Sequence, residues 1–221
     1  MTEEYKSRLF SRISKLNYTN YTLLKRTGIL ICISLISLGV GYISGIFYGG
    51  DTASSNVKDI LISHFCGFFS GLGILDSIRA AISFTLGDIF FILSVLAVGY
   101  TMLSAALGKL ILIIYSARLG GCIALLYDML ITDPCIENGK SAFALFILAK
   151  LSVLCALVFS VIQSEDFSFR FCEIFNKQRF PIKSRESVSY IKTLSSTAGF
   201  TALINIIYLI FQSIQKYTPI V

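Results

Sequence analysis

The stretch GILICISLISLGVGYISGIFYGG, residues 28–50, contains no charged side chain and spaces glycines four residues apart near its end. A helix of about 20 apolar residues is long enough to cross the ~30 Å hydrocarbon core of a bilayer. The run is too long for the apolar part of a cleaved signal, and no small-residue cleavage site follows it. Residues 28–50 therefore predict a transmembrane helix.

The rest of the chain has the same character. Hydrophobic residues make up 55% of the 221 residues and charged residues only 14%, whereas a soluble domain carries about 25% charged residues. Four further apolar runs predict spans at residues 80–103, 109–131, 141–163 and 197–213. We expect an all-α fold, a polytopic transmembrane helix bundle of about five spans, with a cytoplasmic basic segment at residues 1–27 and a transmembrane helical domain at residues 28–221.

Residues 56–79 do not fit the pattern of a full span. Their apolar centre is only about 15 residues long, which is short for a bilayer crossing, and it contains His64, while charged residues gather at both ends. We expect a short re-entrant or interfacial helix here. The alternative is a sixth span, which would move the C-terminus to the other side of the membrane.

The first 27 residues combine basic and apolar side chains. The apolar ones approximate one helical face, which predicts a helix on the membrane surface. Polar stretches such as NYTNYT favour the alternative, a disordered basic tail.

Basic residues also indicate the orientation. They concentrate before the first span and between the fourth and fifth spans, and short basic loops stay in the cytoplasm. We therefore expect a multi-pass protein with a cytoplasmic N-terminus and an extracytoplasmic C-terminus. The formal net charge of +6 is interpreted as this signal and as attraction to anionic lipid, and not as a nucleic-acid interface.

Small residues recur at helical spacing in two of the predicted spans. In lipid, helices associate where small side chains let two backbones approach closely. Such packing would serve either the bundle itself or a seam with a partner protein or a second copy of the chain. The residues are Gly41, Gly45 and Gly49 in the first span and Ser116, Gly120 and Ala124 in the third.

Lys109 and Asp128 lie near the ends of a predicted span, where their charges can reach the interface. Three other charged residues lie deeper inside predicted spans, where each costs several kcal/mol unless it is paired or hydrated. Counted from the predicted outer ends, Asp88 and Lys150 lie about 12–14 Å deep and Arg118 about 20 Å deep. Asp88 and Lys150 are therefore predicted to pair. The cluster is either a polar path or coupling site, or a structural ion pair beside an arginine held by backbone carbonyls.

The sequence carries no motif for other chemistry. His64 and Cys66 offer at most two metal ligands, and the six cysteines include no C-x-x-C pair. Cys66 and Cys135 fall on the predicted outer face, either as a disulfide or as free thiols. No phosphate loop or nucleophile elbow occurs. We expect a non-enzyme with no catalytic residues, no cofactor and no metal.

The order of features resembles the integral-membrane family of stage II sporulation protein M. The resemblance rests on a basic N-terminus, a Gly-rich first span, and VLAVGYTMLSAALGKLILIIYSARLGGCIALLY at residues 95–127, where a Gly-bearing turn precedes a span with Arg118, Gly120 and Gly121. Many members carry Pro-His-Gly and a Glu where this chain has Asn138 to Ser141, so it would be a divergent member. The resemblance implies the bacterial cytoplasmic membrane and action with a lytic transglycosylase and an amidase during engulfment.

Two functions follow as hypotheses. The first is a non-catalytic scaffold that localises peptidoglycan hydrolases during sporulation engulfment. The second is a permease-like subunit of a membrane transporter, with the charges inside the spans along a polar pathway. The two differ in what those charges do, because only a transporter needs them for activity.

Overall fold

A computed structural model describes residues 3–48, 74–132, 139–176 and 184–217, with side chains described for most residues in 22–47, 82–128, 143–170 and 187–210. These residues form a bundle of α-helices, so the predicted fold class is confirmed. The helices are α1 (Glu3–Tyr48), α3 (Ile74–Gly99), α4 (Ser104–Thr132), α5 (Gly139–Asn176) and α6 (Ser184–Tyr217).

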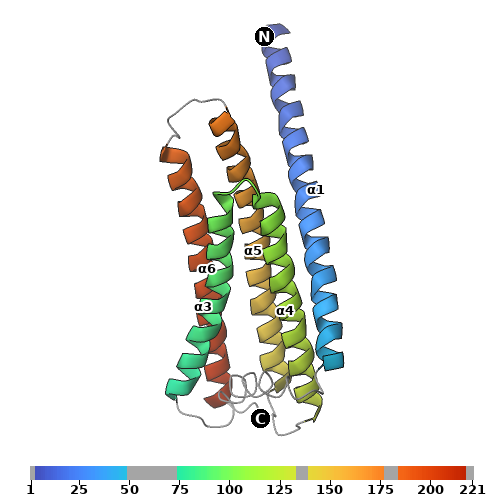
Figure 1. Cartoon of the computed structure of the whole chain (residues 1–221), viewed down its shortest axis with the longest axis vertical. Helices are drawn as coiled ribbons and strands as arrows, with labels where there is room; N and C mark the ends of the chain where they lie inside the picture. Colours follow the sequence, from blue (N-terminus) through green and yellow to red (C-terminus); the bar gives the residue numbers. More distant parts are fainter. Residues whose placement is uncertain (1–2, 49–73, 133–138, 177–183, 218–221) are drawn as a thin grey trace.

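The helices run alternately up and down the long axis of the molecule. α1 starts at the upper end, α3 returns to that end, α4 descends from it, and α5 and α6 repeat the pair (Figure 1). The start of α1 and the end of α6 accordingly lie at opposite ends of the bundle, as a five-span arrangement requires. Which end faces the cytoplasm stays a prediction from the basic residues.

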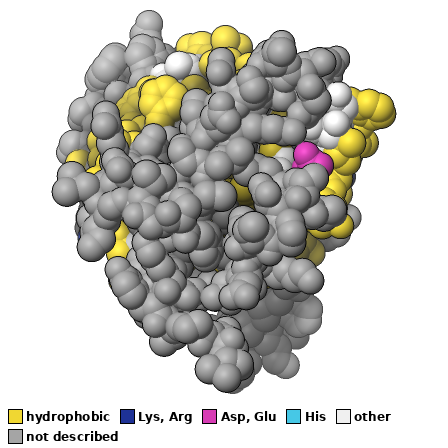
Figure 2. All heavy atoms as spheres, turned by 90° about the horizontal axis from the view of Figure 1, so that it is seen from below, with side chains coloured by type: hydrophobic (Ala, Val, Ile, Leu, Met, Phe, Trp, Pro, Cys, Tyr) yellow, Lys and Arg dark blue, Asp and Glu magenta, His cyan; other side chains and the backbone are white. Residues whose placement is uncertain are grey.

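Large hydrophobic side chains lie on the surface of the bundle as well as in its core. Every described helix exposes large hydrophobic side chains, whereas buried positions include serines, threonines, an aspartate and a lysine. Seen from the end opposite the N-terminus, the described side chains at the surface are mostly hydrophobic (Figure 2). A hydrophobic surface of this kind is favourable in contact with lipid, and the backbone polar groups are satisfied within each helix.

Three of the helices are long and apolar enough to cross a membrane: Thr22–Phe47 in α1, Ser104–Asp128 in α4 and Phe143–Arg170 in α5. The described part of α3 contributes a shorter apolar stretch, Thr85–Gly99. The structure thus supports a membrane protein, while crossings by α3 and α6 remain predictions.

α1 joins the predicted basic segment and the first span in one element. The helix contains 46 residues, which corresponds to about 69 Å at 1.5 Å per residue. This is about twice the hydrocarbon thickness of a bilayer, so the N-terminal half of α1 projects beyond any membrane that its apolar half crosses (Figure 1). Residues 3–27 therefore extend the span and do not form a separate surface helix or a disordered tail.

The second predicted span begins earlier and ends earlier than its sequence boundaries. α3 starts at Ile74, so the last residues of the segment predicted as a short separate helix belong to the helix of that span. Residues 56–73 of that segment lie outside the described residues, as do Gly49, His64, Cys66 and Cys135. The turn that follows α3 lies at residues 100–103, where the Thr101 amide donates to the Val98 carbonyl at 2.9 Å.

The helices fall into two sets by their contacts. α1 packs mainly on α4 and only slightly on α5, whereas α3, α5 and α6 pack on one another and α4 joins them through α3 and α5. The hydrophobic core lies mainly between α3, α4, α5 and α6, where it contains Ile92, Leu112, Phe146, Leu157 and Leu194, and Leu30 of α1 also belongs to it. α1 is therefore attached to one face of a four-helix unit.

Candidate functional site

Four polar side chains from four different helices meet in the core. Asp88 of α3 lies 2.6 Å from the Lys150 ammonium of α5, measured from its Oδ2 atom. The same oxygen accepts a hydrogen bond from the Asn205 amide of α6 at 2.9 Å, and Asp88 Oδ1 accepts one from the Tyr115 hydroxyl of α4 at 3.2 Å. We call these four residues the Asp88 cluster. The predicted pairing of Asp88 with Lys150 is confirmed.

The cluster is buried and internally satisfied. Asp88 is 6% exposed and Lys150 is 4% exposed, so both charges have left solvent and the pair must recover the cost of desolvation. Lys150 also donates to the Asn205 side-chain carbonyl at 3.3 Å and lies 5.9 Å from the centre of the Phe146 ring, within cation–π range. The aspartate thus accepts three hydrogen bonds, and the opposite charges sum to zero.

Tyr115 and Asn205 were not singled out from the sequence, although a signal existed for one of them. Asn205 interrupts the apolar run TALINIIYLI in α6, and a polar amide inside a span is expected to find a partner there. Tyr115 gave no such signal because tyrosines are common in spans and at their ends. Its phenol was identifiable only once the helices were placed.

Arg118 does not join the cluster. It is also not buried among backbone carbonyls, which was one of the arrangements that the sequence left open. Its side chain is exposed on α4, and within the described part of the chain it has no hydrogen-bond or ion-pair partner. The guanidinium lies over Gly87 of α3, where an added Cβ would lie 3.8 Å from one of its nitrogens. This is an ordinary van der Waals distance, so the arginine does not require glycine at this position.

A small cavity of about 30 Å³ separates the cluster from this arginine. It is lined by Asp88, Tyr115, Arg118, Leu119, Cys122, Phe146 and Lys150. This volume holds about one water molecule. A hydrated contact between Arg118 and the buried pair is therefore compatible with the space, whereas a larger solute does not fit without movement of the helices.

A second polar group lies at the turn between α3 and α4. The Ser104 and Ser164 hydroxyls are 2.7 Å apart, Ser164 donates to the Val95 carbonyl at 3.2 Å, and Ser168 donates to the Thr101 carbonyl at 2.6 Å. These bonds give additional donors to a backbone carbonyl near the end of α3 and to one in the turn that follows it. We call Ser104, Ser164, Ser168 and Tyr190 the turn cluster.

Tyr190 of α6 completes the turn cluster. Its hydroxyl donates to the Val95 and Leu96 carbonyls, both at 3.3 Å, and its ring stacks on Phe167 at 4.1 Å between centres. Burial raises the pKa of the Tyr190 phenol above its ordinary value, so the hydroxyl keeps its proton and remains a donor. The turn cluster therefore ties α6 and α5 to the end of α3.

The two predicted small-residue stripes face each other within the chain. A Cβ added at Gly41 would overlap the Ala117 carbonyl, one at Gly120 would overlap the Leu38 carbonyl, and one at Gly45 would lie 2.8 Å from the Ala124 Cβ. Backbones this close require glycine. We call this contact between α1 and α4 the glycine seam.

The glycine seam agrees with one of the two alternatives that the sequence left open, packing within the bundle. The face of α1 that carries Gly41 and Gly45 is covered by α4 of the same chain, so it is a packing surface of the bundle and is not open to a partner. Ser116 is fully buried on the facing helix, where its hydroxyl donates to the Leu112 carbonyl at 2.8 Å. A partner or second copy must use another surface.

The described residues thus form the Asp88 cluster, the turn cluster and the glycine seam. All three hold helices together. No protein-family model, curated protein or solved structure matches this chain.

Proposed function

We propose that the chain is a non-catalytic scaffold of the membrane, a helical bundle that positions other membrane proteins. The observation that supports this proposal is the Asp88 cluster, in which each buried charge is matched by the other and by neutral hydrogen-bonding groups. Lys150 lies 2.6 Å from Asp88, and three hydrogen bonds reach the carboxylate. Charges held in this way fix the relative positions of α3, α4, α5 and α6.

A polar group that carries a solute through a membrane has to exchange partners during each cycle. The partners of Asp88 are instead supplied by three different helices of the same bundle, and the adjoining cavity of about 30 Å³ holds about one water molecule. Stable helix placement is the simplest role for such an arrangement. A rigid bundle also suits a protein whose task is to present a constant surface.

One observation favours the second candidate, a permease-like subunit of a transporter. Arg118 is exposed at the level of the core cluster and shares the small cavity with Asp88 and Lys150. An unpaired cation at this depth is costly in lipid, and a passing anion or a partner subunit would compensate it. This candidate requires Arg118, whereas the scaffold does not.

The resemblance to the sporulation family gives the scaffold its expected partners, a lytic transglycosylase and an amidase that thin septal peptidoglycan. In that setting, septation proceeds without the protein, while membrane migration around the forespore needs it. The partners would be held by the outer ends and the lipid-facing sides of the helices, because the glycine seam is closed by α4.

The test is complementation of a deletion strain of the host with three forms of the protein. They are the wild type, Arg118→Leu, and an apolar variant that combines Asp88→Leu, Tyr115→Phe, Lys150→Met and Asn205→Leu. The readouts are the amount of protein in the membrane, the rate of engulfment, and the position of fluorescently tagged hydrolases.

The scaffold proposal expects arrested engulfment and dispersed hydrolases in the deletion strain, with rescue by every variant that accumulates in the membrane. Normal engulfment in the deletion strain, with the hydrolases in place, would refute it. Failure of Arg118→Leu at wild-type protein levels would instead support the transporter candidate.

A further inference from the structure

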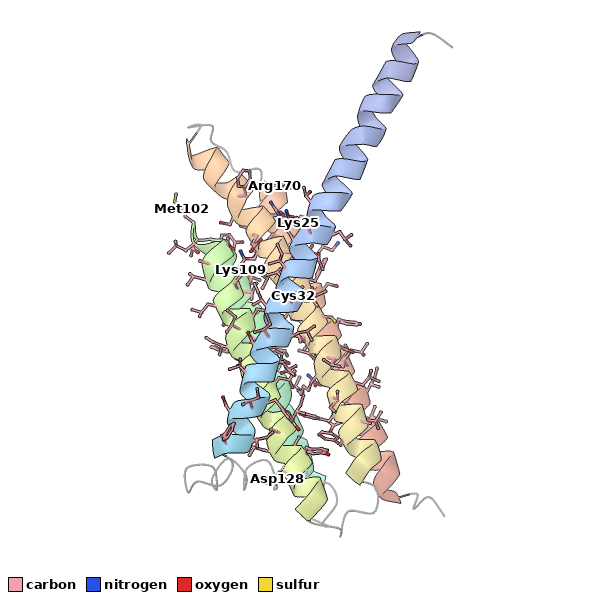
Figure 3. All side chains as sticks on the ribbon, turned by 90° about the vertical axis from the view of Figure 1, so that its right-hand side faces the viewer. Lys25, Cys32, Met102, Lys109, Asp128 and Arg170 are labelled. Carbon is pink, nitrogen blue, oxygen red and sulfur yellow. The ribbon has the colours of Figure 1, made fainter. Side chains whose placement is uncertain are left out.

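An apolar groove runs between α1 and α5, on the side of α1 next to the glycine seam. It encloses about 420 Å³, within the ~300–1,000 Å³ range of small-molecule sites. α1 meets α5 near Lys25 and Arg170 and diverges from it towards the opposite end of the molecule, which opens the groove (Figure 3). The groove lies apart from the Asp88 cluster and is independent of the function proposed above.

The lining of the groove shows that its occupant is apolar. Large side chains form most of the wall, including Leu35, Leu154 and Phe159. The hydroxyls that reach it are already used, because Thr27 donates to the Leu23 carbonyl at 2.9 Å and Ser34 to the Leu30 carbonyl at 2.8 Å. Neither hydroxyl therefore needs a hydrogen bond from an occupant of the groove.

The same lining favours a flexible chain over a helix. Transmembrane helices associate where small residues permit close backbone approach, as the glycine seam does. The groove wall instead presents branched and aromatic side chains such as Ile31, Leu151 and Ile162. A hydrocarbon chain adapts to such a surface, whereas a second helix would be held away from it.

The length of the groove matches one leaflet of a bilayer. Its wall runs from Leu23 to Leu35 on α1 and from Gln163 to Leu151 on α5, which corresponds to about 18 Å along each helix. Half of the ~30 Å hydrocarbon core is about 15 Å. An acyl chain that lies along the groove, with its headgroup at the upper end, would therefore reach about the middle of the membrane.

The upper end of the groove carries polar and cationic groups. Arg26 and Asp166 form an ion pair across it at 3.0 Å, with 57% and 40% of their side chains exposed. Lys25 and Arg170 lie near this crossing and outside the groove lining (Figure 3), both exposed and without an ion-pair partner in the described part of the chain. The amide of Gln163, also on the groove wall, has no hydrogen-bond partner there either.

We propose that the α1–α5 groove binds an anionic phospholipid, with an acyl chain between the helices and the headgroup phosphate at Lys25 and Arg170. Basic pockets at the ends of membrane helices recognise anionic headgroups in this way. Gln163 lies between the two regions, at the level of the lipid ester groups, where its amide can donate a hydrogen bond. The positive charge of the rim and the apolar wall match the two parts of one molecule.

The experiment uses the absence of tryptophan from this sequence. Phe159→Trp places a single fluorophore on the groove wall, and Phe200→Trp places one on the exposed surface of α6 as a control. Each full-length variant is reconstituted into bilayers that contain equal fractions of brominated phosphatidylglycerol or brominated phosphatidylcholine with the same acyl chains, and quenching is measured.

We expect brominated phosphatidylglycerol to quench the groove fluorophore of Phe159→Trp at least threefold more effectively than brominated phosphatidylcholine does. The control fluorophore of Phe200→Trp should be quenched equally by either lipid. Adding Lys25→Gln and Arg170→Gln to Phe159→Trp should remove the difference, while circular dichroism confirms that the helices persist.

Equal quenching of the groove fluorophore by both lipids would overturn the proposal. So would protection of that fluorophore from both lipids, together with a dimer by native mass spectrometry, because a second copy would then fill the groove.

Discussion

The glycine seam and the Asp88 cluster join helices by opposite means. In the glycine seam, α1 and α4 are held by close backbone approach at Gly41, Gly45 and Gly120. In the Asp88 cluster, α3, α4, α5 and α6 converge on one carboxylate through directed bonds. The two contacts therefore tolerate different substitutions. The glycine seam requires that no side-chain atoms are added, whereas the Asp88 cluster requires that every charged or hydrogen-bonding partner is kept.

The largest expected effect comes from placing a side chain in the glycine seam. Gly41→Ile would drive its Cβ into the Ala117 carbonyl, so α1 must separate from α4. We expect a loss of more than about 4 kcal/mol of stability, the range of severe overpacking, seen as a large drop in thermal midpoint in detergent. Gly39→Ile is the matched control, because an added Cβ at Gly39 meets nothing within 4 Å. Equal behaviour of the two variants would show that the seam does not hold α1.

The second effect tests whether the Asp88 cluster depends on matching. Asp88→Leu leaves the Lys150 ammonium buried without its counterion, at an expected cost of about 3–5 kcal/mol. Asp88→Leu with Lys150→Met removes both charges and should recover most of that loss. The measurement is the thermal midpoint of each purified variant. A double variant no more stable than the single one would mean that the pair does not act as a unit.

A smaller effect is expected at the turn cluster. Ser164→Ala removes the hydroxyl that bonds Ser104 and the Val95 carbonyl, which should cost about 1–2 kcal/mol because a buried partner is left unsatisfied. Ser160→Ala is the control one turn earlier, where the equally buried hydroxyl bonds only the Ala156 carbonyl of its own helix. Equal midpoints for the two variants would show that the bonds between helices add no stability.

The smallest effect is expected at the ion pair between Arg26 and Asp166. Both side chains are substantially exposed, and exposed pairs contribute about 0–1 kcal/mol. A double-mutant cycle with Arg26→Gln and Asp166→Asn should give a coupling at the low end of that range, which disappears at high salt. A coupling that persists at about 1 M salt would show that the pair is shielded from solvent and contributes more to the contact between α1 and α5.

The helical class and the Asp88–Lys150 pair could be predicted from the sequence, because both follow from the free-energy cost of placing polar or charged groups in lipid. Long uncharged runs have few alternatives to membrane helices, and opposite charges at equal depth are expected to pair. Asn205 and Tyr115 could not be assigned to the same site, because their roles depend on how α4 and α6 rotate about their axes. The glycine stripes were recognised as packing surfaces, yet only the placement of α1 against α4 showed that they are partners of each other.

The boundaries at residues 27 and 79 were set by composition, whereas the backbone continues through both. Basic residues are compatible with a helix, so the change from a polar to an apolar stretch near Thr27 marks a change of environment and not the end of an element. The same holds at Arg79, which lies inside α3. Hydropathy thus marks apolar stretches and does not mark helix ends.

The pairing of α1 with α4 also has a consequence for biogenesis. During synthesis α1 is made before α4, its main contact, because α3 lies between them in the chain. The glycines of α1 must therefore stay uncovered until ribosomes have delivered residues 104–132. In this interval the bare stripe is available to any nearby helix with small residues, so a chaperone or insertase that shelters it would raise the yield of correctly assembled protein.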